Sequence, residues 1–397
     1  MPNYYDFPAV QTYTLGCGAI KELFRLTRGY GRRYLIILDR HAKGQIARDI
    51  QWGLDHPSSQ PAILADNLIG RAPGLLDSLQ RPQKDTPPAP EYQFFSLTDR
   101  VCCQDSARRL GQIIRDSGAQ IVVAVGGSKC QDLVRAALHF VGDGYLRPKL
   151  VLCPTVLASN ASTNGMSVLY DQDGRQMTDF WSLPLMPECV IVDTGLLIQT
   201  PVATFVAGIG DQLASSVEAL HTLKATGEAT VCDPLCIAHH QAVLEVLMRH
   251  SAAAVQAMRR GEITPEFEWV CHALTRYTGP QLAVATSYFA HILDEALIAI
   301  PAVAQRMHGE VVAFGVLAEM AVFGTPERIR PLAALYRQIG LPTTLTELGA
   351  ENCGYEDLLC CCQQAADKIM ASRALIHWRP EEMARAVLEA DRLVQSG

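Results

Sequence analysis

Short strand-like runs of mostly apolar residues, separated by helical patterns, fill the first half of the chain and stop near its middle. The runs cover residues 34–38, 91–97, 120–125, 149–153 and 189–193. Strands that are apolar along their whole length are typical of a parallel sheet that helices cover on both faces. The sequence therefore predicts an α/β domain over residues 1–194.

The second half of the chain has helical periodicity and no convincing strand run. Ala, Leu, Glu, Met and Gln dominate it. The predicted helices cover residues 203–223, 233–260, 265–277, 281–299, 309–323, 326–339, 355–370 and 379–395. We therefore expect an all-α domain over residues 195–397, with a small-molecule site in the cleft between the two domains.

The composition argues against several classes of protein. With 49% hydrophobic and 19% charged residues the chain is too apolar to be disordered, and its net charge of −7 argues against nucleic-acid binding. No stretch approaches about 18 uninterrupted apolar residues, so no membrane span is expected. The 13 cysteines in a long chain without a recognisable signal peptide indicate reduced thiols and a cytoplasmic protein.

Two segments interrupt the alternation of strands and helices. Prolines crowd residues 67–90, which predicts an exposed loop or an insertion. Residues 167–177 carry a polar turn at 171–174 between two strand-like arms, which predicts a β-hairpin.

A glycine turn follows the most apolar strand, at residues 120–125. Gly126 and Gly127 precede Ser128 and Lys129, which begin a helical pattern. Glycines let the backbone approach a ligand, and the helix N-terminus offers unpaired N–H groups, so the turn suits a pyrophosphate. The alternative is a tight turn that needs glycine only for packing.

Asp39 ends the first strong strand. A carboxylate in that place can accept hydrogen bonds from an adenosine ribose and would repel the 2′-phosphate of NADP. The alternative is a capping or solvated aspartate, and the neighbouring Arg40 leaves the choice between NAD and NADP open.

The first set of candidate metal ligands in the helical half is Asp211, His291 and His308. Two histidines and one carboxylate leave coordination positions free for water or substrate, as catalytic zinc and iron sites require. Nothing local links these distant positions, and a histidine in a helix is more often a hydrogen-bonded structural residue. A rival structural zinc cluster is Cys232, Cys236, His239 and His240.

Several separate segments resemble the group III, iron-containing, alcohol dehydrogenases, closest to their glycerol dehydrogenase branch. The matching segments, in the family's order, are residues 125–132, 154–170, 208–219, His291 with 300–301, and 308–315. The 17-residue interval between His291 and His308 is also close to that of the branch.

The resemblance implies an NAD-dependent, divalent-metal-dependent oxidoreductase that interconverts a small alcohol or polyol and its aldehyde or ketone. It implies a Rossmann-like NAD-binding domain followed by a helical catalytic domain, the two-domain architecture of dehydroquinate synthase. Zinc or iron would be held by Asp211, His291 and His308, and members commonly form homo-oligomers. NAD, favoured over NADP, would lie along Asp39, Gly126, Gly127, Ser128, Lys129, Asp132, Thr155, Ala158, Asn164, Met166 and Tyr170.

Two departures from the family pattern bear on substrate choice. Ser128 stands where the family has a third glycine. Asn160 stands where glycerol dehydrogenases carry an aspartate that contacts substrate hydroxyls. Asparagine keeps the size but loses the charge, so we expect Asn160 to contact the substrate without strong specificity for glycerol.

Three alternatives remain open at the level of sequence. The first is a glycerol-1-phosphate dehydrogenase, which a phosphorylated substrate would reveal. The second is a sugar-phosphate cyclase related to 3-dehydroquinate synthase, although residues 203–320 are poor in the Lys and Arg that would grip a phosphate. The third is an inactive nucleotide-binding homologue, although all three candidate metal ligands are present.

Overall fold

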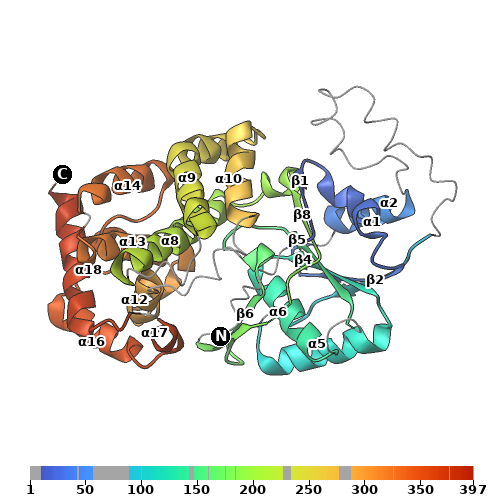
Figure 1. Ribbon diagram of the computed structural model, residues 1–397, viewed down its shortest axis with the longest axis horizontal. Helices are drawn as coiled ribbons and strands as arrows, with labels where there is room; N and C mark the ends of the chain where they lie inside the picture. The colour runs from blue at the N-terminus through green and yellow to red at the C-terminus, as the bar shows by residue number, and fades with distance from the viewer. Residues whose placement is uncertain are drawn as a thin grey trace.

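The computed structural model describes residues 10–42, 44–56, 89–99, 101–142, 147–159, 161–174, 176–183, 185–226, 234–276, 288–324, 326–374 and 376–396. Asn160, Cys232 and nearly all of the proline-rich segment lie outside these residues. A sheet-containing half and a helical half lie side by side (Figure 1).

The sheet half is built on six parallel strands, five of which the strand-like runs predict. The strands lie in the order β1-β8-β5-β4-β2-β3. Their bounds are Thr12–Gly16 (β1), Arg33–Leu38 (β2), Glu91–Ser96 (β3), Ile121–Gly126 (β4), Lys149–Pro154 (β5) and Cys189–Asp193 (β8). The edge strand β1 was not predicted, because its alternating threonines and only half-buried side chains lack the apolar signal of the others.

Helices cover both faces of this sheet. Along β4, Val122 and Ala124 pack toward α5 (Gln104–Ser117) and α6 (Ser128–His139). The alternate residues Ile121, Val123 and Val125 belong to the core of the opposite face. That face is covered by the short helices η1 (Ala19–Glu22) and α1 (Leu23–Thr27) and by α2 (Gln45–Asp55). Burial on both faces explains why the inner strands β2, β4, β5 and β8 are apolar along nearly their whole length.

After Asp193 the described residues form helices and no strand. The helices are α7 (Thr194–Leu197), α8 (Val202–Thr226), α9 (Pro234–Arg260), α10 (Pro265–Thr275), α12 (Phe289–Leu297), η4 (Val303–Gln305), α13 (His308–Val322), α14 (Pro326–Ile339), α15 (Leu345–Leu348), α16 (Tyr355–Ala365), α17 (Ile369–Arg373) and α18 (Pro380–Gln395). None of the described helices is both long and apolar enough to cross a membrane. The division into domains at residues 194/195 stays a prediction.

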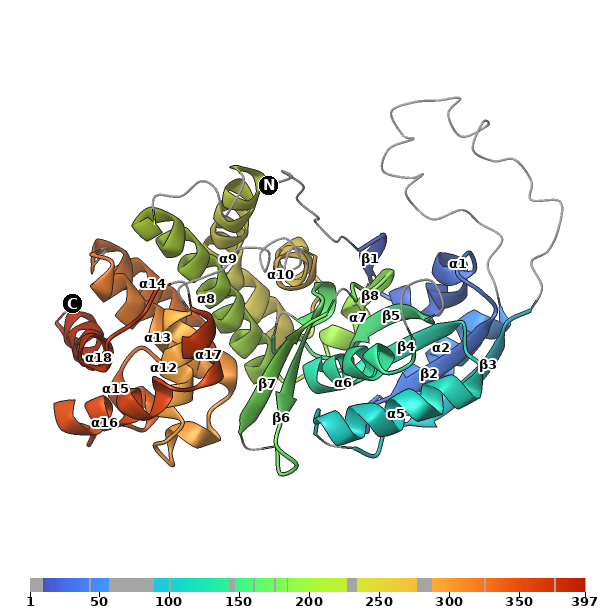
Figure 2. The same cartoon turned by 60° about the horizontal axis from the view of Figure 1, so that its bottom comes forward.

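A β-hairpin lies between the two halves (Figure 2). Its strands β6 (Met166–Tyr170) and β7 (Met177–Ser182) pair antiparallel, as predicted, after the short helix η3 (Ala161–Thr163). β7 contacts α17 of the helical half, where the Arg373 guanidinium lies 5.2 Å from the Phe180 ring centre. Thr275 ties the halves together again: its hydroxyl lies 2.7 Å from the Tyr13 hydroxyl, and its carbonyl accepts from Thr163.

Candidate metal and cofactor site

Three helices bring the predicted metal ligands together. Asp211 lies in α8, His291 in α12, and His308 is the first residue of α13. Asp211 Oδ1 lies 3.6 Å from His291 Nε2 and 3.7 Å from His308 Nε2. One ligand atom from each residue lies within 4.8 Å of the others, and the described residues form no second cluster of this kind.

Glycines explain how the helices come close enough. A Cβ atom on Gly210 would overlap the carbonyl oxygen of Gly309, and one on Gly309 would overlap the carbonyl oxygen of Ala207. α8 and α13 therefore cross with their backbones in contact, directly beside Asp211 and His308. The glycines of both family segments have a packing role that the sequence pattern alone did not indicate.

Two further carboxylates orient the histidines. His291 Nδ1 lies 2.8 Å from Glu218 Oε2, and His308 Nδ1 lies 2.8 Å from Asp294 Oδ2. Each imidazole is thereby turned so that its Nε2 faces Asp211. A carboxylate behind a histidine is the usual support of a metal-binding imidazole, because it fixes the ring and its tautomer.

The charges of this cluster perturb all three ligands. Burial opposes ionisation of Asp211, but hydrogen bonds from His291 and His308 outweigh it and hold the pKa of this carboxyl well below its usual range. Burial lowers the pKa of His291, yet the Glu218 and Asp211 carboxylates raise it to about 10 overall. The pKa of His308 is raised well above its usual value by Asp294 and Asp211, against the effect of burial. The site thus favours positive charge between the ligands, whether protons or a cation.

The glycine turn lies at the carboxyl end of β4, where the strand order reverses. From β2 the chain adds β3 on one side and β4 on the other. A crevice at such a reversal is where parallel sheets bind nucleotides. Gly127 precedes α6, and its N–H lies 3.5 Å from a carboxylate oxygen of Asp39, so both predicted features meet there. A Cβ on Gly126 would overlap Cys130 and Asp39, so the packing reason for a glycine also holds.

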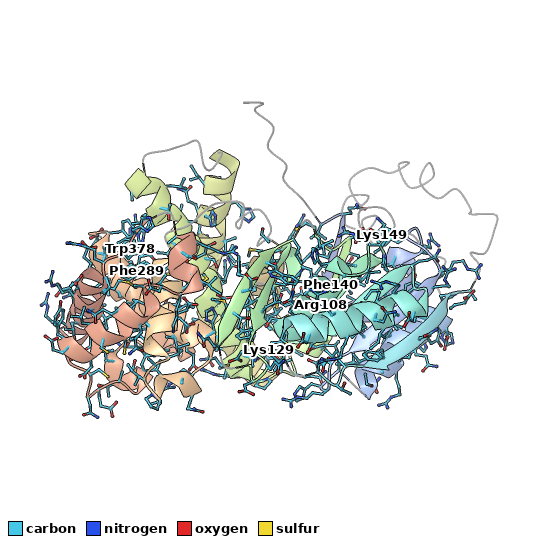
Figure 3. All side chains as sticks on the ribbon, turned by 90° about the horizontal axis from the view of Figure 1, so that it is seen from below. Arg108, Lys129, Phe140, Lys149, Phe289 and Trp378 are labelled. Carbon is cyan, nitrogen blue, oxygen red and sulfur yellow. The ribbon has the colours of Figure 1, made fainter. Side chains whose placement is uncertain are left out.

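One cavity of about 720 Å³ joins the turn to the metal cluster. Its wall includes ten of the predicted site residues: Ser128, Lys129, Asp132, Ala158, Asn164, Met166, Tyr170, Asp211, His291 and His308. Figure 3 shows Lys129 beside the hairpin, and its ammonium lies 5.5 Å from the centre of the Tyr170 ring. Asp39, Gly126, Gly127 and Thr155 are not among the lining residues, and Asn160 lies outside the described part of the chain.

Asp132 faces inward as well as lining the cavity. It forms a 2.9 Å ion pair with the fully buried Arg135, whose guanidinium also donates to the carbonyls of Ala161 and Met166. This network fixes the segment that runs from η3 into β6 along the cavity. Burial raises the pKa of Asp132 to about 6 despite the guanidinium.

Sequence reasoning did not predict several residues of this site. Glu218 lies seven residues after Asp211, two turns along the same helix face, a spacing that could have suggested its role. Asp294 stands three residues after His291 but supports the other histidine, which no spacing reveals. Tyr288, whose ring stands perpendicular to that of His291 at 6.2 Å, also lines the cavity.

Known proteins resemble this chain in sequence. A family model described as iron-containing alcohol dehydrogenase matches residues 56–194. A glycerol dehydrogenase of Escherichia coli O6:H1 is 30% identical over 304 residues, covering 74% of this chain and 80% of that protein. A glycerol dehydrogenase of Thermotoga maritima is 28% identical over 273 residues, covering 67% of this chain and 72% of the relative.

Solved structures agree in fold. A crystal structure of a probable glycerol dehydrogenase from Sinorhizobium meliloti 1021 superimposes with a TM-score of 0.80 at 22% identity, covering 99% of both chains. The glycerol dehydrogenase of Schizosaccharomyces pombe gives 0.79 at 23% identity, covering 99% of this chain and 92% of the other.

These similarities place the chain in the class of metal-dependent dehydrogenases. More narrowly, the chain belongs to the iron-containing alcohol dehydrogenase family, in its glycerol dehydrogenase-like branch. It is accordingly an NAD- and metal-dependent oxidoreductase of alcohols or polyols, as the resemblance implied. The comparisons favour none of the three alternatives over this function.

Proposed function

We propose that Asp211, His291 and His308 hold one zinc or iron ion against the hydroxyl of a small polyol, beside NAD anchored at the glycine turn. The observation that carries this proposal is that the three ligand atoms converge in the wall of the cavity that also contains Ser128 and Lys129.

The donor set fits a divalent ion. Bonds of about 2.1 Å in tetrahedral geometry separate two ligand atoms by about 3.4 Å. Asp211 Oδ1 lies 3.6 and 3.7 Å from the two histidine Nε2 atoms, close to that value. Three protein ligands leave a position for substrate, and when bound the ion supplies Lewis acidity at the substrate oxygen.

The chain's own groups would then position the reactants. The N–H groups at the start of α6 and the Lys129 ammonium face the place where the pyrophosphate would lie. Asp39, beside that turn, favours NAD over NADP because its charge would repel a 2′-phosphate. Glu218 and Asp294 keep both imidazoles in one tautomer, and Arg135 holds the segment along the cofactor.

Two features favour an uncharged polyol or its carbonyl as substrate. The Lys and Arg side chains among the described lining residues are Lys129 and Lys368 alone, too few to grip a phosphate in addition to the cofactor. Relatives in sequence include glycerol dehydrogenases and, at 29% identity, the glycolaldehyde reductase of Halobacterium salinarum. A homo-oligomer and a cytoplasmic location stay predictions.

The test of this function is Asp211→Ala. Loss of the carboxylate should abolish metal retention and lower kcat at least about 1000-fold, because Lewis-acid stabilisation is worth several kcal/mol. Binding of NAD, measured by calorimetry, should be largely unchanged, since the glycine turn lies on other elements. Metal content is measured by mass spectrometry, and turnover by nicotinamide absorbance.

Asp116→Ala is the matched control, because this aspartate lies in α5 on the outer surface and should change none of the three readings. Full metal content or full activity in Asp211→Ala would refute the metal assignment.

A further inference from the structure

A glutamate and a lysine lie together in the wall of the cavity. Glu295 is four residues after His291 in α12, and Lys368 directly precedes α17. Both line the cavity that contains the candidate metal ligands. The proposed chemistry at the metal does not use either side chain.

Lys368 is held at the end of α12. Its ammonium donates to the carbonyl oxygen of Glu295 at 2.6 Å. The N–H of Ala299 donates to Ala296 instead, so the Glu295 carbonyl is one of the acceptors that a helix end leaves without a backbone donor. An ammonium has three N–H donors, and this bond uses one.

Glu295 has an unused acceptor. Its side chain lies next to the backbone N–H of Met370, which donates to the carboxylate, and the residue is 7% exposed. Oε2 has no hydrogen-bond partner within the described part of the chain. A buried carboxylate oxygen without a donor costs free energy, so a donor from a ligand would be bound favourably. Burial also raises the pKa of this carboxyl, against the effect of Lys368.

The pair offers one acceptor and one donor of opposite charge. A hydroxyl group both donates and accepts, so it can satisfy the two side chains together. A carboxylate in the same place would be repelled by Glu295, and an ammonium would be repelled by Lys368. The chemistry of the pair therefore matches a neutral hydroxyl.

The distance along the helix suits a short polyol. Residues four apart on a helix share a face, with Cβ atoms about 5–6 Å from each other. An alcohol oxygen at the site of His291 and a hydroxyl at Glu295 would thus be separated by about 5 Å, which is close to the spacing of the two terminal oxygens of an extended three-carbon diol.

We propose that Glu295 and Lys368 bind a second hydroxyl of the substrate and so select diols over simple alcohols. This inference rests on the proposed function and adds to it the residues that choose the substrate.

The test compares two alcohols that differ by one hydroxyl, 1,3-propanediol and 1-propanol, in the metal-loaded enzyme with NAD. Glu295→Leu removes the acceptor, and Lys368→Met removes the donor but keeps the aliphatic stem. In each variant kcat/KM for 1,3-propanediol should fall about 10- to 100-fold, while kcat/KM for 1-propanol should change less than about 3-fold. Calorimetric binding of 1,3-propanediol should weaken by a similar factor.

Ile298→Ala is the matched control, because this residue lines the same cavity without a polar group and should affect both alcohols alike. An equal fall for both alcohols in Glu295→Leu or Lys368→Met would reduce the pair to a structural role. The inference would also be overturned if the variants kept the wild-type ratio of kcat/KM for the diol to kcat/KM for 1-propanol. Absence of alcohol turnover in the wild type would instead refute the proposed function. The role of Glu295 and Lys368 would then be judged by calorimetry, where weaker diol binding in the two variants supports it and unchanged binding contradicts it.

Discussion

At the scale of single residues, the backbone of Tyr288 is unusual. Its φ of 50° is the one positive value among the described residues other than glycine. A side chain in this left-handed conformation costs about 1–2 kcal/mol. The residue immediately precedes α12 and places an aromatic wall against His291, so the strain coincides with the candidate active site.

The strain predicts a difference between two truncations. Tyr288→Gly and Tyr288→Ala both remove the ring, but only alanine keeps a Cβ in the left-handed region. Urea denaturation should therefore find Tyr288→Gly more stable than Tyr288→Ala by about 1 kcal/mol. Equal stability of the two variants would show that the backbone relaxes without cost.

The same scale shows what could be predicted residue by residue. The family resemblance indicated Asp211, His291 and His308 as candidate metal ligands, since no local spacing joins them. Glu218 and Asp294 were not predicted, because their contacts with the two histidines form only when three helices pack together. For Asp39 the structure shows the capping interpretation, because its carboxylate accepts the His41 N–H at 2.6 Å, whereas contact with an adenosine ribose stays a prediction.

At the scale of elements, the crossing of α8 and α13 sets the geometry of the proposed metal ligands Asp211 and His308. The backbones touch at Gly210 and Gly309, so a single methyl group would push the helices apart. His308 adjoins this contact and would move with α13.

Gly309→Ala should therefore lower the free energy of unfolding by about 1–3 kcal/mol and weaken metal binding, because backbone carbonyls cannot yield like flexible side chains. Chemical denaturation and a metal titration measure the two effects. Gly29→Ala serves as the control, since a Cβ there meets no atom within 4 Å, and its effect should stay within about 0.5 kcal/mol. Wild-type metal affinity in Gly309→Ala would contradict the role given to the crossing.

Elements were predicted best where burial is complete. The strands β2, β4, β5 and β8 are buried along nearly their whole length, so their composition alone identifies them. β1 was not predicted, because a half-buried edge strand does not need to be apolar along its whole length. The predicted helix over 355–370 ends at Ala365, since a periodic pattern does not mark where packing stops a helix.

At the scale of the whole molecule, one buried histidine gives global stability a dependence on pH. His240 in α9 is fully buried, and neither ring nitrogen has a hydrogen-bond partner among the described residues. Burial, with a smaller effect from His239, lowers the pKa of His240 from 6.5 to about 4.

The sign follows from proton binding. Above pH 6.5 the imidazole is neutral in both states, so this group adds no pH dependence. Between pH 6.5 and pH 4 only the unfolded chain takes up the proton, so stability falls as the pH falls. His240→Leu cannot titrate, and should gain up to about 3 kcal/mol over the wild type between pH 7 and pH 4.

Unfolding by urea across this range measures the gain. Val243→Ala in the same helix provides the control, because neither side chain titrates and its difference from the wild type should not vary with pH in the way expected for His240→Leu. A constant difference for His240→Leu would mean that the buried imidazole is not what titrates.

The order of an α/β half followed by a helical half could be predicted from the sequence, because strand-like apolar runs fill the first half and are absent from the second. The meeting of Ser128 and Lys129 with Asp211 in one cavity was implied by the family resemblance alone, since no pattern in the residues shows how the halves pack.

The proposed metal ligands all come from helices after Asp193, whereas the glycine turn and Asp39 belong to the strands before it. Mutations that alter the proposed ion site can therefore accumulate in one stretch of the gene while the proposed coenzyme anchor is inherited unchanged. Such a separation allows related enzymes to change their metal without a change in how they bind NAD.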